Sequence, residues 1–440
     1  MKFFADLHIH SKYSRATSPQ MDLEHLDKAA QIKGVDVLSC GDFTHPAWFS
    51  ELKNKLAPAE PGLYQLKSIS NSEPAGEIFR EYPQDDKNAH QGDRGVRFIL
   101  TTEISCIYSK NGKVRKVHIL IFAPDLETVE KINIRLGQIG NLKADGRPIL
   151  GLDAKELAKI VLNINPDCLV VPAHCWTPWF AVFGSKSGFD SLEECFEDYT
   201  KYIYAVETGL SSDPKMNWRL SALDKVAFIS CSDAHSAAKL AREACCFDTA
   251  LSYGGVVSAI KSKDPKKFLF TIEFFPEEGK YHFDGHSDCK ICFSPQETKK
   301  HKGVCPVCQR PLIVGVLNRV EQLADRPEGF TPVNAVPFKP LVPLQEILSE
   351  MSGVGVNSKQ VAKQYEQIIK KFGPELSILL DLPVANLKDQ GFLDLAQALQ
   401  AMRQGNITVE PGYDGVYGKV SVFAQKNKKE KRALQQTLIC

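Results

Sequence analysis

The sequence predicts an α/β protein, either a β/α barrel or a doubly wound sheet, followed by a small metal-binding unit and a helical unit. Three observations predict it: short apolar runs alternate with amphipathic segments up to about residue 265, polar residues follow these runs, and paired cysteines come next. The chain has 440 residues, a formal net charge of +1 and 43% apolar residues. These values are typical of a globular protein with about two to four domains.

The composition excludes several classes of protein. The apolar fraction is too high for a mainly disordered chain. No apolar run approaches the ~18–20 residues that span a bilayer, so we expect no membrane part. The segment 1–10 carries an aspartate and two histidines, which a secretory signal would not tolerate. The 13 cysteines are scattered and odd in number, so we expect a reducing, cytoplasmic setting. We also expect a monomer.

Short runs rich in Val, Ile, Leu and Phe predict buried parallel strands. They lie at 35–39, 96–101, 117–122, 168–171, 203–206 and 226–230. Amphipathic segments predict helices at 22–33, 125–138 and 153–162, each opened by an aspartate, with Gly34 closing the first. The stretch 57–95, rich in Pro, Gly, Ser and Asn, predicts a long functional insertion over one face.

Polar side chains follow the predicted strands directly. In β/α barrels the carboxyl ends of different strands meet and build the active site. One such residue would be an ordinary solvated loop residue, but a series of them favours a site. The series is Asp42, Glu103, His174, Glu207 and Asp233.

The segment Asp6-Leu7-His8-Ile9-His10 predicts metal binding. On a strand, alternate residues share a face, so Asp6, His8 and His10 lie together. Burying them without partners would be costly, and a metal ion resolves this. Any one histidine could equally be an ordinary core or surface residue, whereas many at strand ends predict one site. Further candidates are Asp42, His45, Glu103, His118, His174, Asp233 and His235.

These motifs, in this order, resemble the polymerase-and-histidinol-phosphatase superfamily of phosphoesterases. The matching segments are 6–10, 41–45, Glu103, His118, 172–174 and 232–235. The resemblance implies a distorted seven-stranded β/α barrel over 1–270 that holds two or three divalent ions (Zn, Mn, Mg or Fe). It implies that the first ion is bound by His8, His10, Glu103 and Asp233, the second by Glu103, His118 and His174, and the third by His235 with Asp42 and His45.

The same resemblance implies that Asp233, Glu103 and His174 carry catalysis. Two departures concern the third ion. The sequence has Asp42-Phe43-Thr44-His45 where the superfamily has Thr-Asp-His, and the segment 11–15 lacks the histidine that often follows the first motif.

Two cysteine pairs predict a structural zinc unit at 280–320. The spacing of Cys289, Cys292, Cys305 and Cys308 is typical of a closed four-thiolate site, whose metal supplies folding energy. A single redox-active cysteine pair fits this spacing poorly. The surrounding lysines and arginines indicate contacts with DNA phosphates, or else a solvated basic face.

The region 340–425 predicts a helical, DNA-binding unit. The turn Gly353-Val354-Gly355 before the helix at 358–371 resembles a helix-hairpin-helix, which binds phosphate at a helix N-terminus, although glycine turns also join helices for steric reasons. The glycine-rich segment 411–418 either contacts DNA or turns the chain. The basic tail at 426–440 ends in a segment, 435–439, that loosely resembles a sliding-clamp-binding peptide.

Several residues near the motifs are candidates for DNA contact. Arg15 and Lys186, with Lys12, could hold phosphates of the substrate. Trp176, Trp179 and Phe180 follow His174 and either stack on a base or plug the core.

The order of the three units resembles the endonuclease Q family of DNA-repair nucleases. This resemblance implies cleavage on the 5′ side of uracil, hypoxanthine or xanthine, and at abasic sites, with the base flipped out. One alternative is a phosphatase or 3′-5′ exonuclease of the same superfamily. The other is a non-catalytic DNA-binding scaffold.

Overall fold

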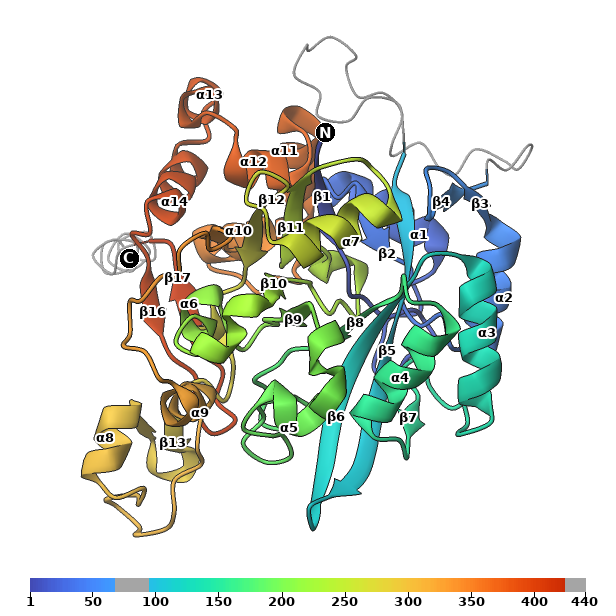
Figure 1. Cartoon of the computed structure of the whole chain (residues 1–440). Helices are drawn as coiled ribbons and strands as arrows, with labels where there is room; N and C mark the ends of the chain where they lie inside the picture. Colours follow the sequence, from blue (N-terminus) through green and yellow to red (C-terminus); the bar gives the residue numbers. More distant parts are fainter. Residues whose placement is uncertain (68–94, 424–440) are drawn as a thin grey trace, which may run out of the picture.

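The structure, a computed structural model, describes residues 1–67 and 95–423. The basic tail at 426–440, with its predicted clamp-binding peptide, and most of the predicted insertion at 57–95 lie outside these residues. Figure 1 shows a mixed α/β body with the predicted zinc unit projecting at one corner and the last helices packed along one side. The predicted α/β class with a helical C-terminal region is confirmed.

The body is built on an 11-stranded mixed sheet with the order β15-β12-β11-β1-β2-β5-β4-β3, in which β6 pairs with β5 and β8. A separate parallel pair, β9–β10, continues beyond β8, where the amide of Cys175 bonds to the carbonyl of Glu207 at 3.0 Å. The strands are β1 (Lys2–Asp6), β2 (Val37–Ser39), β3 (Leu56–Pro58), β4 (Leu63–Leu66), β5 (Arg97–Lys110), β6 (Lys113–Ala123), β7 (Ile149–Leu150), β8 (Leu169–Pro172), β9 (Ala205–Glu207), β10 (Ala227–Ile229), β11 (Ala244–Asp248), β12 (Phe268–Glu273) and β15 (Phe338–Pro340).

The expectation of parallel strands is only partly correct. Strands β1, β2 and β5 are parallel neighbours, but β5 and β6 form a long antiparallel hairpin. The two-residue turn Asn111-Gly112 joins them, and both residues have positive φ. Asn-Gly is the strongest short hairpin signal, because a tight turn between strands needs positive φ at both positions. That signal was present in the sequence and predicts the antiparallel pairing.

The three predicted helices are confirmed together with their caps. Asp22, Asp125 and Asp153 each accept a backbone hydrogen bond at a helix start, and Gly34 ends the first helix with φ of 84°. The helices of the body are α1 (Leu23–Lys33), α2 (Pro46–Lys55), α3 (Leu126–Gly137), α4 (Ala154–Ile164), α5 (Leu192–Phe196), α6 (Pro214–Asn217) and α7 (Tyr253–Ser262), with the 3₁₀ turns η1 (Glu197–Tyr202), η2 (Ser221–Lys225) and η3 (Ala237–Lys239).

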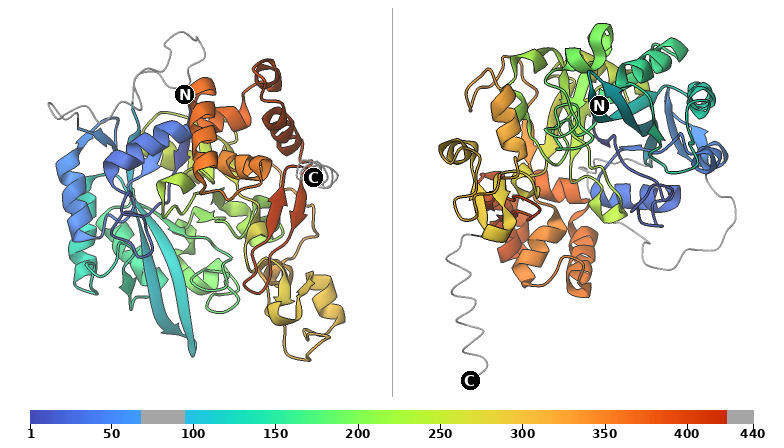
Figure 2. Two further views of the ribbon diagram at one scale, coloured as in Figure 1. Left: turned by 180° about the vertical axis from the view of Figure 1, so that it is seen from behind. Right: turned by 90° about the horizontal axis from the view of Figure 1, so that it is seen from below.

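The cysteine unit and the C-terminal helices follow. Figure 2 shows from two further sides that the C-terminal helices and the β16–β17 ribbon pack on the body, while the cysteine unit lies at its edge. Their elements are η4 (Pro276–Glu278), β13 (Asp284–His286), η5 (Ser287–Cys289), β14 (Ile291–Phe293), α8 (Pro295–Lys300), α9 (Val316–Leu323), α10 (Leu344–Ser352), α11 (Lys359–Phe372), α12 (Glu375–Leu380), α13 (Val384–Asp389), α14 (Leu393–Arg403), β16 (Thr408–Glu410) and β17 (Lys419–Ser421).

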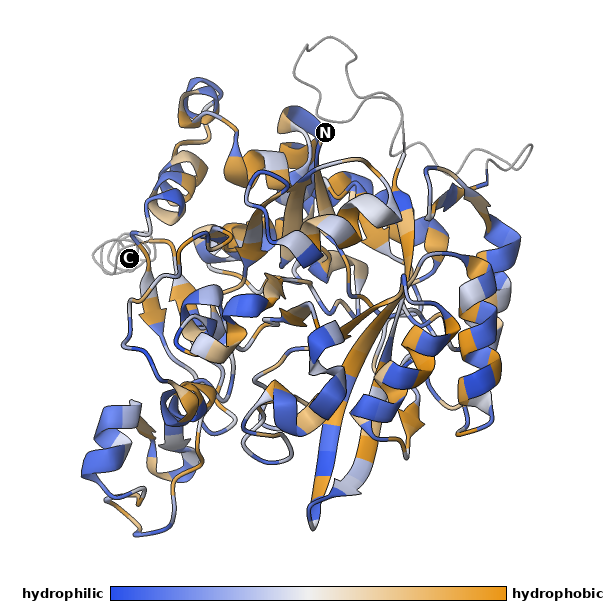
Figure 3. Ribbon diagram, in the orientation of Figure 1, coloured by the Kyte–Doolittle hydropathy of each residue, from blue (hydrophilic) through white to orange (hydrophobic). Residues whose placement is uncertain are grey.

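The apolar core lies inside the strand layer and between the strands and the helices around it, where Figure 3 shows strands that are largely hydrophobic and helices with mixed faces. Phe3, Phe247 and Phe268 are buried there, and the rings of Phe247 and Phe268 stack at 4.8 Å. This packing fixes the strands whose carboxyl ends carry the polar residues. No helix in the described part of the chain is long and apolar enough to cross a membrane.

Candidate metal centre

Two groups of potential metal ligands lie side by side. Four of their residues follow strands β1, β8 and β10, whereas Glu103 and His118 lie within β5 and β6. The first comprises His8, His10 and Asp233, and the second Glu103, His118 and His174. Within each group the ligand atoms all lie within 4.8 Å of one another. The structure thus brings together residues from both ends of a stretch of more than 200 positions, at the places that the sequence motifs indicate.

Glu103 connects the two groups. Its Oε2 lies 3.7 Å from Nε2 of His8 and 3.4 Å from Nε2 of His10. Its Oε1 lies 2.9 Å from Nδ1 of His118 and 3.0 Å from Nε2 of His174. The carboxylate therefore presents one oxygen to each group, which is the arrangement of a bridging ligand.

Buried carboxylates hold the histidines in place. Oε1 of Glu207 lies 2.9 Å from Nδ1 of His8, and Oδ1 of Asp42 lies 3.0 Å from Nδ1 of His10. In both cases Nε2 is left facing the centre. Carboxylates on the far nitrogen fix the orientation and tautomer of metal-binding histidines. Glu207 and Asp42 thus act on the centre through His8 and His10.

The strand-end residues have an unusual backbone. Asp42, His174 and Asp233 adopt φ of 45°, 26° and 47°, in the left-handed region that residues other than glycine seldom enter. Such strain persists only where the surroundings impose it, and it clusters at functional sites. The three residues follow β2, β8 and β10, and two of them, His174 and Asp233, belong to the ligand groups.

The donor set fits divalent cations. Nε2 of His8, Nε2 of His10 and Oδ1 of Asp233 are buried and have no hydrogen-bond partner. Burial works to lower the pKa of His8, but Glu207 and Glu103 outweigh it and raise that pKa well above its usual value. Burial lowers the pKa of His118 to about 4, so this imidazole is neutral at pH 7. Buried ligand atoms without hydrogen-bond partners, surrounded by several carboxylates, are what a cation site requires.

The predicted third group does not assemble among the described residues. Oδ2 of Asp42 accepts hydrogen bonds from Ser11 and Ser14, so both its oxygens are already engaged. His45 stacks on the ring of Tyr13 at 4.5 Å instead of facing the other ligands. His235 lies beside His10, with ring centroids 4.4 Å apart. Asp6 is a structural residue, because it accepts backbone hydrogen bonds from Ser232 and Ala241.

Sequence reasoning missed Arg147. Its guanidinium lies 3.1 Å from Oε2 of Glu103, and the loop that carries it is held by a bond from the amide of Gly146 to the carbonyl of Tyr13 at 3.0 Å. A Cβ at Gly146 would meet Oδ2 of Asp42 at 2.3 Å, so only glycine lets this loop pass so close to the centre. Arg147 follows no predicted strand, and no motif marks it.

The cysteine unit differs from its prediction in one ligand. His286, Cys289, Cys305 and Cys308 present ligand atoms within 4.8 Å of one another. Cys292 is not in this group, and its Sγ lies 3.9 Å from the carbonyl oxygen of Pro411.

The pairing of β13 with β14 explains this difference. It sets His286 opposite Ile291 and Gly285 opposite Cys292. Adjacent residues of a strand point to opposite faces, so Cys292 faces away from the side chain of His286. The chemistry of the group, three thiols and one imidazole, is that of a tetrahedral zinc site.

The predicted DNA-contact residues fall into three kinds of environment. Trp176 is 1% exposed and its Nε1 donates to Asn217, so it is a core residue, which is one of the two alternatives that the sequence left open. Trp179 is 42% exposed, and the ring of Phe180 lies 4.7 Å from that of His118. Lys186 is exposed on the same loop, and Arg15 is exposed beside Asp145, 3.3 Å away.

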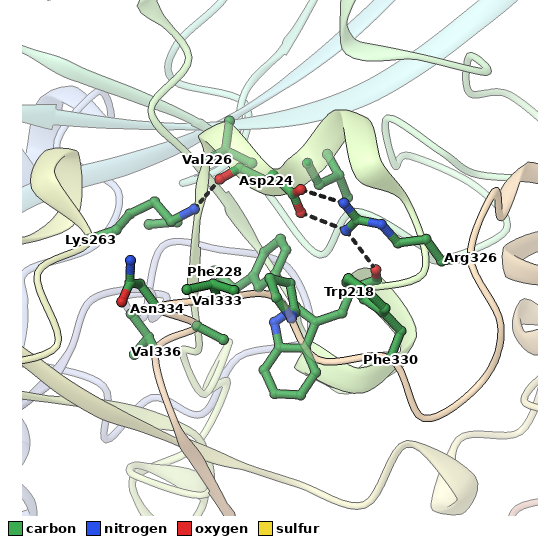
Figure 4. Close-up of a pocket in the computed structure, with 14 residues that line it drawn as sticks. Trp218, Asp224, Val226, Phe228, Lys263, Arg326, Phe330, Val333, Asn334 and Val336 are labelled. Carbon is green, nitrogen blue, oxygen red and sulfur yellow. Dashed lines mark hydrogen bonds and ion pairs between the residues drawn. The ribbon is translucent and has the colours of Figure 1, made fainter.

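A cavity of about 310 Å³ lies elsewhere, beside β10 and the segment 326–336 (Figure 4). Arg326 there forms a two-pronged ion pair with Asp224, and Lys263 bonds to the carbonyl of Asp224. Val226 and Ala227 line it at the amino end of β10, opposite the end that leads to Asp233. No member of the two ligand groups lines this cavity.

A mixed α/β sheet that gathers histidine and carboxylate groups at one place defines a class: α/β proteins with a candidate metal centre. Within that class, the chain is similar over nearly its whole length to endonuclease Q. The crystal structure of the lesion-specific endonuclease PfuEndoQ from Pyrococcus furiosus is 29% identical, with a TM-score of 0.80 over 96% of this chain and 95% of that one. The resemblance that the sequence indicated is confirmed.

A second structure, endonuclease Q in complex with a 27-mer duplex substrate that has an abasic lesion at the active site, is also 29% identical, with a TM-score of 0.80 over 97% of this chain and 98% of that one. Residues 343–406 match the family model of the MJ0043 C-terminal domain.

Two further proteins are similar in sequence, one over part of its length and one over nearly all of it. The protein MJ0043 of Methanocaldococcus jannaschii is 34% identical over 58% of this chain, but the match spans only 32% of that longer protein. The protein YqxK of Bacillus subtilis is 26% identical over 95% of this chain and 99% of its own length.

Proposed function

We propose that the chain is a metal-dependent DNA-repair endonuclease that hydrolyses the phosphodiester on the 5′ side of a deaminated base (uracil, hypoxanthine or xanthine) or at an abasic site. The observation that carries this proposal is the bridging position of Glu103 between the two ligand groups. The fold is that of endonuclease Q, with which the chain shares 29% sequence identity. The complex of that enzyme with abasic DNA supports the choice of substrate.

The two ligand groups define the reaction centre. His8, His10, Asp233 and Glu103 would hold one divalent ion, and Glu103, His118 and His174 a second. Such ions lower the pKa of a water and neutralise charge on the phosphate and the leaving oxygen. Glu207 and Asp42 keep His8 and His10 oriented, so the ligands need little rearrangement when the substrate arrives.

Arg147 supplies a fixed positive charge at the same place. Its guanidinium approaches the centre through Glu103, and its side chain remains partly exposed. An arginine there can pair with a non-bridging phosphate oxygen in two-pronged geometry. Its role is to position the scissile phosphodiester and to stabilise the negative charge that grows on it.

The other units bind the duplex. Helices α10 and α11, joined by the turn from Gly353 to Ser358, form a hairpin whose second helix carries an exposed row of lysines. Exposed lysines bind the phosphate backbone independently of sequence. The row comprises Lys359, Lys363, Lys370 and Lys371. The zinc unit lies at the edge of the body, and a lesion base is reached by flipping it out of the stack.

The test uses an end-labelled duplex with one deoxyuridine, incubated with the protein and Mg²⁺, Mn²⁺ or Zn²⁺, beside a matched duplex with thymidine. A single nick 5′ to the uracil is expected, and no cut in the control. Progressive shortening would identify an exonuclease instead. Binding without cutting by the metal-loaded protein would identify a non-catalytic scaffold.

Asp233→Asn should abolish cleavage and retain DNA binding, because it removes one ligand of the first group. Asp248→Asn is the matched control, since Asp248 lies opposite Lys2 at the far end of β1. Retained cleavage in Asp233→Asn would remove that residue from the centre.

A further inference from the structure

A continuous row of aromatic and cationic side chains leads away from the metal centre. The ring of Phe180 lies 4.7 Å from that of His118, and the neighbouring Trp179 meets Tyr281 edge-on at 5.9 Å. The row continues through Lys280, whose Nζ lies 5.6 Å from the ring of Tyr281 and 5.8 Å from that of Tyr417. We call Phe180, Trp179, Tyr281, Lys280 and Tyr417 the aromatic row.

The start of the row is held rigidly. Phe180 has φ of 63°, which is a rare conformation for an aromatic residue. Its amide donates to Oγ of Ser187 at 3.1 Å, and its carbonyl accepts from the amide of His118 at 2.9 Å. A strained residue fixed from both sides beside a metal ligand indicates a functional position. The same bonds fix the direction of Trp179.

The far end of the row is built by the glycine-rich segment 411–418. The amides of Gly412, Gly415 and Gly418 bond to the carbonyls of Glu277, Lys280 and Glu278 at 2.8–3.0 Å. A Cβ at Gly418 would lie 2.0 Å from the carbonyl oxygen of Glu277, so the close contact requires glycine. These three hydrogen bonds hold Tyr417 beside Lys280. These glycines serve close packing, and Tyr417 is presented outward.

The exposure and charge of the row indicate its ligand. Tyr417 is 73% exposed and Trp179 is 42% exposed, which is unusual for such large rings. The ammonium group of Lys280 lies between the rings, and Lys116 lies 5.3 Å from the ring of Phe180. Partly exposed rings alternating with cations complement a strand of unpaired nucleotides, whose bases stack while their phosphates pair with lysine.

We propose that the aromatic row is a stacking platform for the unpaired nucleotides that flank the lesion on the strand that is cut. The proposal rests on the proposed nuclease function and assigns the path of that strand: from the metal centre over Trp179 and Tyr281 to Tyr417. Lys280 and Lys116 hold its phosphates. Fixing the flanking bases in this way keeps the scissile phosphate at the centre while the lesion leaves the stack.

The test uses the full chain, loaded with metal, as Trp179→Ala, Tyr281→Ala and the conservative Trp179→Phe. Tyr202→Ala is the matched control, because Tyr202 is exposed but precedes the amino end of β9. Three properties are measured: binding of single-stranded oligothymidine by fluorescence anisotropy, nicking of an abasic duplex, and hydrolysis of bis(p-nitrophenyl) phosphate, which needs the centre alone.

Both alanine variants should bind oligothymidine about tenfold more weakly, the size of one lost base–aromatic stack. The KM for nicking should rise, hydrolysis of the small diester should be unchanged, and Trp179→Phe should bind nearly as the native chain does. Unchanged oligothymidine binding in both alanine variants would overturn the proposal, even where the native chain nicks lesion DNA. If the native chain nicks no DNA but its binding of single strands depends on Trp179, the stacking platform stands and the nuclease function is refuted.

Discussion

Oε1 of Glu207 lies 2.9 Å from Nδ1 of His8, while Oε2 of the same carboxylate accepts the backbone amide of His174 at 2.7 Å. One fully buried side chain therefore fixes a ligand of each metal group. Glu207 sits at the end of β9, in the two-stranded pair outside the large sheet. The position of the β9–β10 pair therefore determines where His8 and His174 lie.

Glu207→Gln should weaken metal binding about 10- to 100-fold, because the neutral amide is a poorer acceptor for the proton on His8. Titration of the metal-free protein with Mn²⁺ or Zn²⁺, followed by calorimetry, measures the change. Glu156→Gln, on the exposed face of α4, is the control. Equal affinities in the two variants would show that Glu207 does not act through His8.

Arg147→Met should lower the single-turnover rate of nicking by roughly 10²-fold, the usual cost of one lost group that stabilises transition-state charge. The metal content should be unchanged, because Arg147 is not a ligand. Arg135→Met, on the exposed side of α3, serves as control. Full activity of Arg147→Met would show that the Arg147–Glu103 ion pair only stabilises the fold and takes no part in the reaction.

The contrast between Glu207 and Arg147 shows which residues of the site can be predicted from the sequence and which cannot. Glu207 was found because it follows an apolar run, and the helix starting after Asp22 was found because caps are local signals. Arg147 lies in a loop that reaches the centre only through the packing of Gly146 on Asp42. Such proximity depends on tertiary structure and leaves no periodicity or spacing in the chain.

The cysteine unit shows a second limit. Spacing predicted that Cys292 is the fourth ligand, whereas in the structure His286 lies among the converging ligand atoms and Cys292 does not. Spacing counts residues along the chain, but the face of a strand on which a side chain lies depends on its partner. His286 precedes Cys289 by three positions, a spacing that could have marked it as a candidate.

Zinc analysis distinguishes these two ligand sets. His286→Ala and Cys305→Ser should each lose the zinc of this unit and lower its thermal stability, because the metal supplies folding energy to so small a core. Cys292→Ser should keep a full equivalent. Metal content is measured by mass spectrometry on proteins purified without chelators. Zinc loss in Cys292→Ser, with retention in His286→Ala, would restore the four-cysteine site.

A buried ion pair fastens the C-terminal helices to the body. Nζ of Lys33 on α1 lies 2.5 Å from Oε2 of Glu375 on α12, and Oε1 of Glu375 accepts the amide of Leu344 at 2.9 Å. Lys33→Met should destabilise the chain by about 3–5 kcal/mol, since it leaves a buried carboxylate without its cation. Lys33→Met with Glu375→Gln should recover part of this loss. Thermal unfolding measures both, with exposed Lys131→Met as control; no effect of Lys33→Met would show that α12 is held by apolar packing alone.

The stability of the chain should also depend on pH through Glu273. This residue is fully buried on β12, and burial raises its pKa to about 8 against hydrogen bonds from Thr271 and Thr208. The folded chain keeps this proton up to about pH 8, whereas the unfolded chain releases it near the ordinary value of 4.5. Between these two values the folded state binds more protons, so its stability falls as the pH rises.

Glu273→Gln stays neutral at every pH and should remove this decline. Between pH 5 and pH 8.5 the melting temperature of this variant should rise relative to that of the native chain. The corresponding difference in the free energy of unfolding should grow by at least about 1 kcal/mol, because one unit of pKa shift corresponds to ~1.4 kcal/mol. Glu156→Gln should follow the native profile, since that carboxylate is exposed. A difference between Glu273→Gln and the native chain that stays constant with pH would mean that Glu273 is ionised in the fold, with its charge balanced by the hydroxyl groups of Thr271 and Thr208.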